Sequence, residues 1–167
     1  MNNYILEYYQ AIKDGSIIVG EYIRLWYEYI VKGLKKKSFF YDQKKANRSI
    51  KFVETFGHHH EGELAPSLIK LELWQKAFLS VIFGILDKNG LRQFREIVLI
   101  VGRKSGKSLL CSAIAEYLAF LDGEYGARIF FVAPKLDQAR ICYDGFYQML
   151  IKEPELNDMA KKRRTDV

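Results

Sequence analysis

The fold of this chain is decided by residues 97–108, which read Ile97-Val98-Leu99-Ile100-Val101-Gly102-Arg103-Lys104-Ser105-Gly106-Lys107-Ser108. The first five of these residues form an uninterrupted apolar run, which is typical of a buried strand. The residues that follow, from Leu109 to Leu121, have the pattern of a helix. A turn between a strand and a helix is a place where backbone N–H groups and the helix N-terminus cradle phosphates.

The end of this turn, Gly106-Lys107-Ser108, has the residue types that bind a nucleoside triphosphate. Lys107 is expected to reach the β- and γ-phosphate oxygens, and the Ser108 hydroxyl is expected to ligate Mg²⁺. The strict pattern requires a glycine five residues before Gly106, where this chain has Val101. The alternative is an ordinary helix start with Ser105 or Ser108 as the N-cap.

The order of predicted elements indicates an α/β fold. A second apolar run covers residues 128–133 and ends at Pro134, and a helix is predicted from about 136 to 150. Strand, phosphate loop, helix, strand and helix in this order are the opening of a P-loop αβα sandwich with an incomplete parallel sheet. We therefore expect the first part of a P-loop ATPase domain over residues 61–167.

The residues before this domain are predicted to be helical. Apolar side chains recur at helical spacing over 5–12, 19–31 and 42–56, with Asp42 as a candidate N-cap, and again over 71–85. We expect residues 1–60 to form a helical N-terminal region that precedes the ATPase domain.

The chain is moderately basic, with a net charge of +6 and a pI near 9.2. This charge fits an acidic partner such as DNA or a nucleotide without requiring one. The favoured interpretation of the main basic cluster is a solvated helix face. It comprises Lys32, Lys35, Lys36, Lys37, Lys44, Lys45, Arg48 and Lys51, with Asp42 as the single acidic residue between them. A second cluster covers 161–164.

Cysteine and histidine residues do not indicate a metal site. Cys111 and Cys142 lack metal-ligand spacing and read as buried, reduced thiols, which favours a cytosolic compartment. Three adjacent histidines, residues 58–60, cannot all face one metal from a regular element, so a surface-lining loop is expected there.

No signal peptide is read at the N-terminus, and no apolar run approaches the ~20 residues of a membrane span.

Four blocks of this sequence resemble the large terminase subunit of tailed bacteriophages, the ATPase of the DNA-packaging motor. The most specific are the loop at 102–108 and the block Ala133-Pro134-Lys135-Leu136-Asp137-Gln138-Ala139-Arg140. The others are Leu71-Glu72-Leu73-Trp74-Gln75 with Phe83-Gly84 after it, and Tyr8 to Val19 with the later Phe40-Tyr41-Asp42 and Ile50-Lys51-Phe52-Val53-Glu54. Terminases use a deviant phosphate loop with an early arginine, which agrees with Arg103 and with the absence of glycine at position 101.

The resemblance implies roles for particular residues and implies ATP and Mg²⁺ as cofactors. Lys107 would bind phosphate, Ser108 would ligate the metal, and Arg103 would stabilise the charge that develops on the γ-phosphate. The loop residues Gly102, Ser105 and Gly106 would surround the phosphates. Gln75 would read adenine and Trp74 would pack beside the base. Arg103 in a helix-end salt bridge and Trp74 as a core residue are the structural alternatives.

Two parts of the family's machinery have no match here. The carboxylate pair that follows a later strand in terminases, and the C-terminal nuclease domain, are not found in residues 151–167. We therefore expect an N-terminal part of a terminase whose isolated chain binds nucleotide weakly at best and does not turn it over. Because its strand edges are uncovered, we expect this chain to be marginally stable or to self-associate. The resemblance implies double-stranded DNA, the small terminase subunit and the portal protein as partners, a homo-oligomeric ring, and the bacterial host cytoplasm.

Two other functions remain open at this point. The chain resembles a helicase fragment in having a glutamine upstream of its phosphate loop, although helicases usually keep the full glycine pattern and lack Arg103. In the second alternative the basic helical region binds DNA or a motor partner, and the loop no longer acts on nucleotide.

Overall fold

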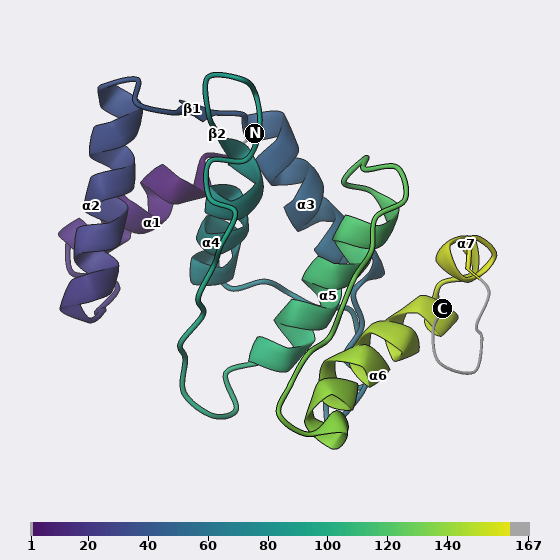
Figure 1. Cartoon of the computed structure of the whole chain (residues 1–167). Helices are drawn as coiled ribbons and strands as arrows, with labels where there is room; N and C mark the ends of the chain where they lie inside the picture. The colour runs from purple at the N-terminus through teal and green to yellow at the C-terminus, as the bar shows by residue number, and fades with distance from the viewer. Residues whose placement is uncertain (1, 161–167) are drawn as a thin grey trace. The chain divides into compact units, whose positions relative to one another are not determined.

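The computed structural model describes residues 2–160, and within them the chain forms seven helices and two short strands (Figure 1). In chain order these are α1 (Tyr4–Lys13), α2 (Glu21–Lys35), β1 (Phe40–Tyr41), α3 (Gln43–Phe56), α4 (Leu73–Gly84), β2 (Ile85–Leu86), α5 (Lys107–Phe120), α6 (Leu136–Lys152) and α7 (Pro154–Asn157). All six helices that apolar periodicity predicts are present, with ends shifted by a few residues. None of the helices described has the length and apolar character needed to cross a bilayer.

The chain divides into two compact units that are interleaved along the sequence. Unit 1 runs to Lys51 and includes Leu71–Val98, whereas unit 2 comprises Phe52–Lys70 and the residues from Leu99 onward. The polypeptide therefore passes from one unit to the other three times.

Unit 1 is built around one buried apolar cluster to which α1, α2 and α4 all contribute. The cluster contains Ile5, Tyr8, Tyr27, Ile30, Val31, Phe39, Ala77, Val81 and Ile85. The rings of Tyr8 and Tyr27 meet edge to face, with centroids 4.9 Å apart. Strands β1 and β2 pair antiparallel, with Phe40 opposite Leu86.

Helix α3 begins as the sequence predicts. The Asp42 Oδ1 atom accepts hydrogen bonds from the backbone N–H groups of Lys44 (2.9 Å) and Lys45 (3.0 Å), which is the geometry of an N-cap. All eight basic residues between 32 and 51 are exposed, in agreement with a solvated face. Lys32 pairs with Glu28 one helical turn away, at 2.8 Å. The second basic cluster, residues 161–164, lies outside the described residues.

Unit 2 has a core formed mainly by α5 and α6, which pack against each other. Its buried side chains include Leu110, Ala113 and Tyr117 of α5 and Phe146, Met149 and Leu150 of α6. The end of α3 joins this core, since the Phe52 ring lies 5.5 Å from the ring of Tyr117.

The parallel sheet expected from the sequence is not present among residues 2–160. The only paired strands described there are β1 and β2, and the segments 97–101 and 128–133 have no sheet pairing. The predicted burial of the first segment is also wrong, since Val98 is 82% exposed and Ile100 is 89% exposed. Burial nevertheless alternates along the second segment: Phe130 is 77% exposed and Val132 is 89% exposed, while Phe131 packs on Tyr143 and Phe146. A strand exists only when a second strand accepts its hydrogen bonds, and the described residues supply no such partner here.

Helix α5 carries a buried carboxyl group in the core of unit 2. Glu116 is 0% exposed, and neither of its carboxyl oxygens has a hydrogen-bond partner among the described residues. Burial, with a smaller contribution from the Glu153 carboxylate, raises the pKa of Glu116 to about 8. Glu116 is therefore a neutral acid in the folded chain at pH 7.

This burial makes the stability of the chain depend on pH. Below the ordinary pKa of 4.5, Glu116 is neutral in both the folded and the unfolded chain, so it does not oppose folding. As the pH rises from there toward 8, the unfolded chain ionises first, and the free energy of unfolding falls by roughly 4 kcal/mol because one unit of pKa difference is about 1.4 kcal/mol. Urea unfolding at several pH values in this range should show that decline in the wild type, and Glu116→Gln should abolish it.

The control for this experiment is Glu124→Gln, which changes an exposed glutamate in a loop of the same unit. This variant should retain the wild-type decline. Parallel pH profiles for wild type and Glu116→Gln would contradict the assignment of a neutral buried acid.

Candidate functional site

The predicted phosphate loop ends where α5 begins. Helix α5 starts at Lys107, and its N-cap is Gly106 in the left-handed conformation, with φ 70° and ψ 16°. Lys104, two residues earlier, is also left-handed, with φ 64°. A non-glycine residue held there costs of order 1 kcal/mol. The loop therefore contains two left-handed residues just before the helix.

The N-terminus of α5 is open to a ligand. The first helical hydrogen bond runs from the Leu110 N–H to the Gly106 carbonyl at 2.9 Å, so the N–H groups of Lys107, Ser108 and Leu109 have no partner within the helix ladder. Residues 102–107 are all exposed, and no atom comes within 4 Å of a Cβ built at Gly106. The turn is thus not plugged by packed side chains, and unpaired N–H groups at a helix N-terminus attract anions.

The alternative of a serine-capped helix is wrong. Gly106 occupies the cap position and provides no side chain, whereas Ser105 precedes it and Ser108 is the second residue of the helix.

Arg103 and Gly102 are exposed in the loop, together with Lys104. Lys107 is exposed as well. The prediction that both cysteines are buried is wrong for Cys111, which is exposed on α5, whereas Cys142 is half-buried.

Ser112 connects the beginning of α5 to helix α6. Ser108 itself is half-buried, and its side chain opposes the rise in the pKa of the Cys142 thiol that burial causes. One turn further along α5, the Ser112 Oγ atom lies 2.9 Å from the Ser108 carbonyl oxygen and 2.8 Å from the Cys142 carbonyl oxygen. The first turn of α5 is therefore attached to α6 by both side-chain and backbone groups.

Gly145 permits this close approach of the two helices. A Cβ at Gly145 would lie 2.7 Å from Ser112 Oγ and 3.0 Å from His60 Cε1. The first distance is shorter than real Cβ contacts allow, so the two helices meet here only because position 145 has no side chain.

The predicted adenine-binding residues belong to unit 1, whereas the phosphate loop belongs to unit 2. Gln75 lies in the first turn of α4, where its Oε1 accepts a hydrogen bond from the Glu72 backbone N–H at 2.8 Å. Trp74 is half-buried and packs against the apolar cluster of unit 1. In this structure Gln75 contributes to a helix cap and Trp74 contributes to a core.

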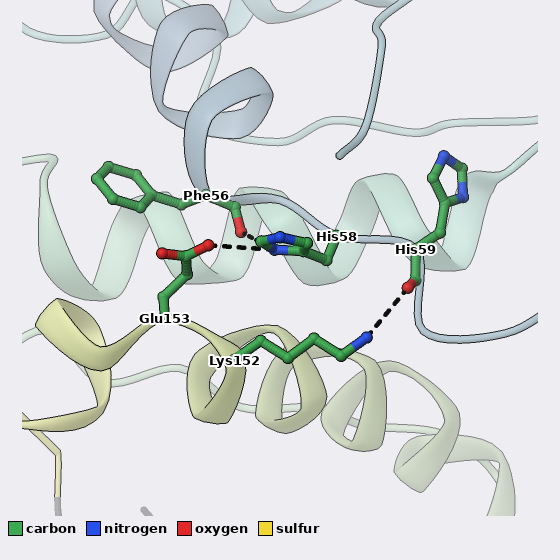
Figure 2. A network of polar contacts seen from close by, with 5 residues as sticks. All are labelled: Phe56, His58, His59, Lys152 and Glu153. Carbon is green, nitrogen blue, oxygen red and sulfur yellow. Dashed lines mark hydrogen bonds and ion pairs between the residues drawn. The ribbon is translucent and has the colours of Figure 1, made fainter. Parts of the chain in front are cut away.

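Figure 2 shows that His58 and the backbone of His59 contact residues at the end of α6. The His58 Nδ1 atom lies 3.0 Å from the Phe56 carbonyl oxygen and 3.3 Å from Glu153 Oε1. Lys152 donates a hydrogen bond from Nζ to the His59 carbonyl oxygen at 3.3 Å.

The triplet lies outside any helix or strand, as expected for a loop, and all three histidine side chains are half-buried. The His60 ring lies against Gly145 of α6. Burial lowers the pKa of His59 below its ordinary value. Across residues 2–160, no group of three His, Cys, Asp or Glu side chains is arranged to hold a metal.

Sequence reasoning missed the contact between α5 and α6. Ser108 and Ser112 are one helical turn apart, and Gly145 and Cys142 are almost one turn apart on the next helix, so small residues recur at helical spacing on both. That pattern is typical of helices whose backbones approach closely. It is the feature of the sequence from which the contact between α5 and α6 could have been predicted. Nothing in the sequence indicates that the Ser112 hydroxyl contacts the Cys142 carbonyl oxygen in particular.

The comparisons with known proteins agree with the resemblance found in the sequence. A family model described as "Terminase large subunit, ATPase domain" matches residues 73–167. The chain is similar to the proteins named "Terminase large subunit" of Lactococcus phage p2 and of Lactococcus phage SK1, each 29% identical over 150 residues. These alignments cover 85% of this chain and 26% of each relative, so the chain spans about a quarter of their length. No solved structure matches.

The close helix contact predicts a non-additive pair of substitutions. Gly145→Ala should lower the free energy of unfolding by about 1–3 kcal/mol, because the new methyl group overlaps Ser112 Oγ. The same substitution in a Ser112→Ala background should cost less, because the overlapping atom has been removed. Urea unfolding of the four proteins of this double-mutant cycle measures the coupling.

Ser112→Ala alone is the control, since it removes the hydroxyl without adding volume. Equal costs for Gly145→Ala in the two backgrounds would show that the helices do not meet at this point.

Proposed function

Because this chain belongs to the family of terminase large subunit ATPase domains, we propose that its loop at 102–108 binds the phosphates of ATP together with Mg²⁺. The observation that carries the proposal is the exposed, left-handed turn at Gly106, which opens the N-terminus of α5 directly beside Lys107 and Ser108. Unpaired N–H groups and the positive end of the helix dipole favour the negative charge of a triphosphate at this point.

The side chains of the loop fit this ligand chemically. The Lys107 ammonium supplies a charge-assisted hydrogen bond to phosphate oxygens, and the Ser108 hydroxyl supplies the oxygen ligand that Mg²⁺ prefers. Arg103, exposed in the same loop, is proposed to stabilise the charge that develops on the γ-phosphate. When bound, Mg²⁺ neutralises part of the phosphate charge.

The extended segments 97–101 and 128–133 are proposed as strands of a P-loop parallel sheet. Their support is the alternation of half-buried and exposed apolar side chains, with Phe131 packed on α6. In this proposal residues 1–60 are a helical N-terminal region, and residues 61–167 are the first part of the ATPase domain.

For the protein as a whole we propose ATP-driven packaging of double-stranded DNA into phage heads within the bacterial host cytoplasm. The proposed partners are DNA, a small terminase subunit and a portal protein, with a ring of identical subunits as the assembly. The helicase alternative is not favoured by the family match. In the remaining alternative, a remnant that binds DNA or a partner, Lys107 would have no part in nucleotide binding.

The first test removes the charge at position 107. Lys107→Ala should weaken the binding of a fluorescent, non-hydrolysable ATP analogue by about ten- to hundredfold, because a charge-assisted hydrogen bond is worth about 1.5–3 kcal/mol. Equilibrium titration in the presence of Mg²⁺ measures this effect. Lys104→Ala, which removes an exposed charge three residues away, is the matched control and should bind nearly as well as the wild type.

The outcome separates the two remaining functions. Equal affinities of Lys107→Ala and the wild type for the ATP analogue would reject the phosphate-loop assignment. They would favour the alternative in which the chain binds DNA or a partner and the loop does not act on nucleotide.

The second test concerns base recognition. We propose that Gln75 reads adenine, since an amide can donate to and accept from that base in two parallel hydrogen bonds, and that Trp74 packs beside it. Gln75→Ala should weaken ATP binding about tenfold while GTP binding changes little, measured by competition against the same fluorescent analogue. Loss of the helix cap would affect both nucleotides equally, so GTP serves as the internal control. A parallel loss for ATP and GTP would leave Gln75 with a capping role alone.

A further inference from the structure

Helix α2 has apolar side chains on two opposite sides, and unit 1 covers only one of them. The covered side contributes to the apolar cluster of unit 1 with Tyr27, Ile30 and Val31. On the other side lie Tyr22, Leu25 and Tyr29, which follow one another at spacings of three and four residues, and all three are exposed. We call these three residues the outer face of α2. Tyr22 is 87% exposed and Tyr29 is 53% exposed, so this face leaves two large aromatic rings uncovered.

The outer face is held in place by neighbouring aromatic rings. Trp26 stacks on Tyr29 with ring centroids 5.8 Å apart, and Phe94 packs against Trp26 at 5.1 Å. Tyr29 also meets the buried ring of Phe39 at 6.1 Å. A partner that binds here therefore has little ordering of Tyr29 to pay for, and tyrosine is among the residues that contribute most at interfaces.

The charged residues beside the outer face alternate in sign along the helix. In chain order they are Glu21, Arg24, Glu28 and Lys32. The ion pairs of Glu28 with Lys32 at 2.8 Å and with Arg24 at 3.8 Å agree with a position of these side chains on one flank of α2. Because the order runs acidic, basic, acidic, basic, this flank is complementary to an antiparallel copy of itself.

One register of two such helices satisfies the rings and the charges together. In this register Tyr22 lies opposite Tyr29 of a second, antiparallel copy. The same register brings opposite charges together between the copies, namely Glu21 with Lys32 and Arg24 with Glu28. Twofold symmetry then forms each of these pairs twice.

We propose that the outer face of α2 binds the outer face of a second copy of this chain, with the two helices antiparallel. The alternating charges favour this occupant over a nucleic acid or an anionic membrane surface, because either of those would need a uniformly basic flank. A surface that binds itself closes at two copies, so this contact differs from the head-to-tail contacts that build a ring. It lies in unit 1 and does not depend on nucleotide binding by the loop at 102–108.

The first test measures the dissociation constant of the dimer by sedimentation velocity of the intact 167-residue chain at several concentrations. Tyr22→Ala and Tyr29→Ala should each raise this constant about tenfold or more, because a symmetric contact loses each ring twice. Tyr125→Ala is the matched control, since it removes a fully exposed ring from a loop of unit 2, and it should leave the constant unchanged. Far-UV circular dichroism checks that each variant keeps its helices.

A charge exchange tests the antiparallel register. Glu21→Lys and Lys32→Glu should each weaken the dimer, because each puts like charges opposite one another between the copies. The variant that carries both changes should recover most of the wild-type affinity. These positions lie about 16 Å apart along one helix, so they do not touch within a copy and the recovery must come from contact between copies. The pair of Lys32 with Glu28 is lost in the single and in the double variant, so it makes no contribution to the recovery.

The outcomes decide between this contact and other ways of covering the face. A wild type that stays monomeric at every accessible concentration would overturn the inference, and a partner of another kind would then be the occupant. A dimer that Ile100→Ser weakens, while the two tyrosine substitutions do not, would place the association at the uncovered segment 97–101 and also overturn it. Failure of the double exchange to recover affinity would reject the antiparallel register. The phosphate-loop proposal stands or falls separately, by nucleotide titration.

Discussion

The close approach of α5 to α6 is the constraint on which unit 2 and its candidate site depend. The two helices meet at Ser112 and Gly145, where one missing side chain allows a serine hydroxyl to reach the backbone of the next helix. The same contact orients the first turn of α5, whose N-terminus is the proposed phosphate site. His60 lies against Gly145 at the same place, so the loop that begins at residue 57 also contacts α6. The packing of α5 against α6 therefore also fixes the helix whose N-terminus is the proposed phosphate site.

The sequence predicts the helices of this chain well and its strands less well, for a physical reason. A helix satisfies its own hydrogen bonds, so periodicity and a cap such as Asp42 are enough to locate α3. A strand depends on another strand, and the segments at 97–101 and 128–133 find no such partner among residues 2–160. Burial alternates along residues 128–133, but pairing is a property of two segments and is not encoded in either one.

The candidate site was predictable only where its chemistry is local. The turn at 102–108 has its residue types in consecutive order, so a motif can find it, although the missing glycine at Val101 hides it from the strict pattern. Ser112 and Glu116 depend on groups distant in the sequence, because Ser112 Oγ contacts the Cys142 carbonyl oxygen and Glu116 is buried in the core of unit 2. The histidine triplet illustrates the same limit, since its role follows from Glu153 and Lys152 nearly a hundred residues later.

The interleaving of the two units has a practical consequence for dissecting this protein. Because the polypeptide enters unit 2 at Phe52, returns to unit 1 at Leu71 and leaves it again after Val98, neither unit is a continuous stretch of chain. No single protease cut releases either one whole. A deletion from either end that removes one unit completely also removes part of the other unit, so it confuses their contributions. Separating them calls for circular permutation, or for grafting residues 52–70 onto the later part by a short linker.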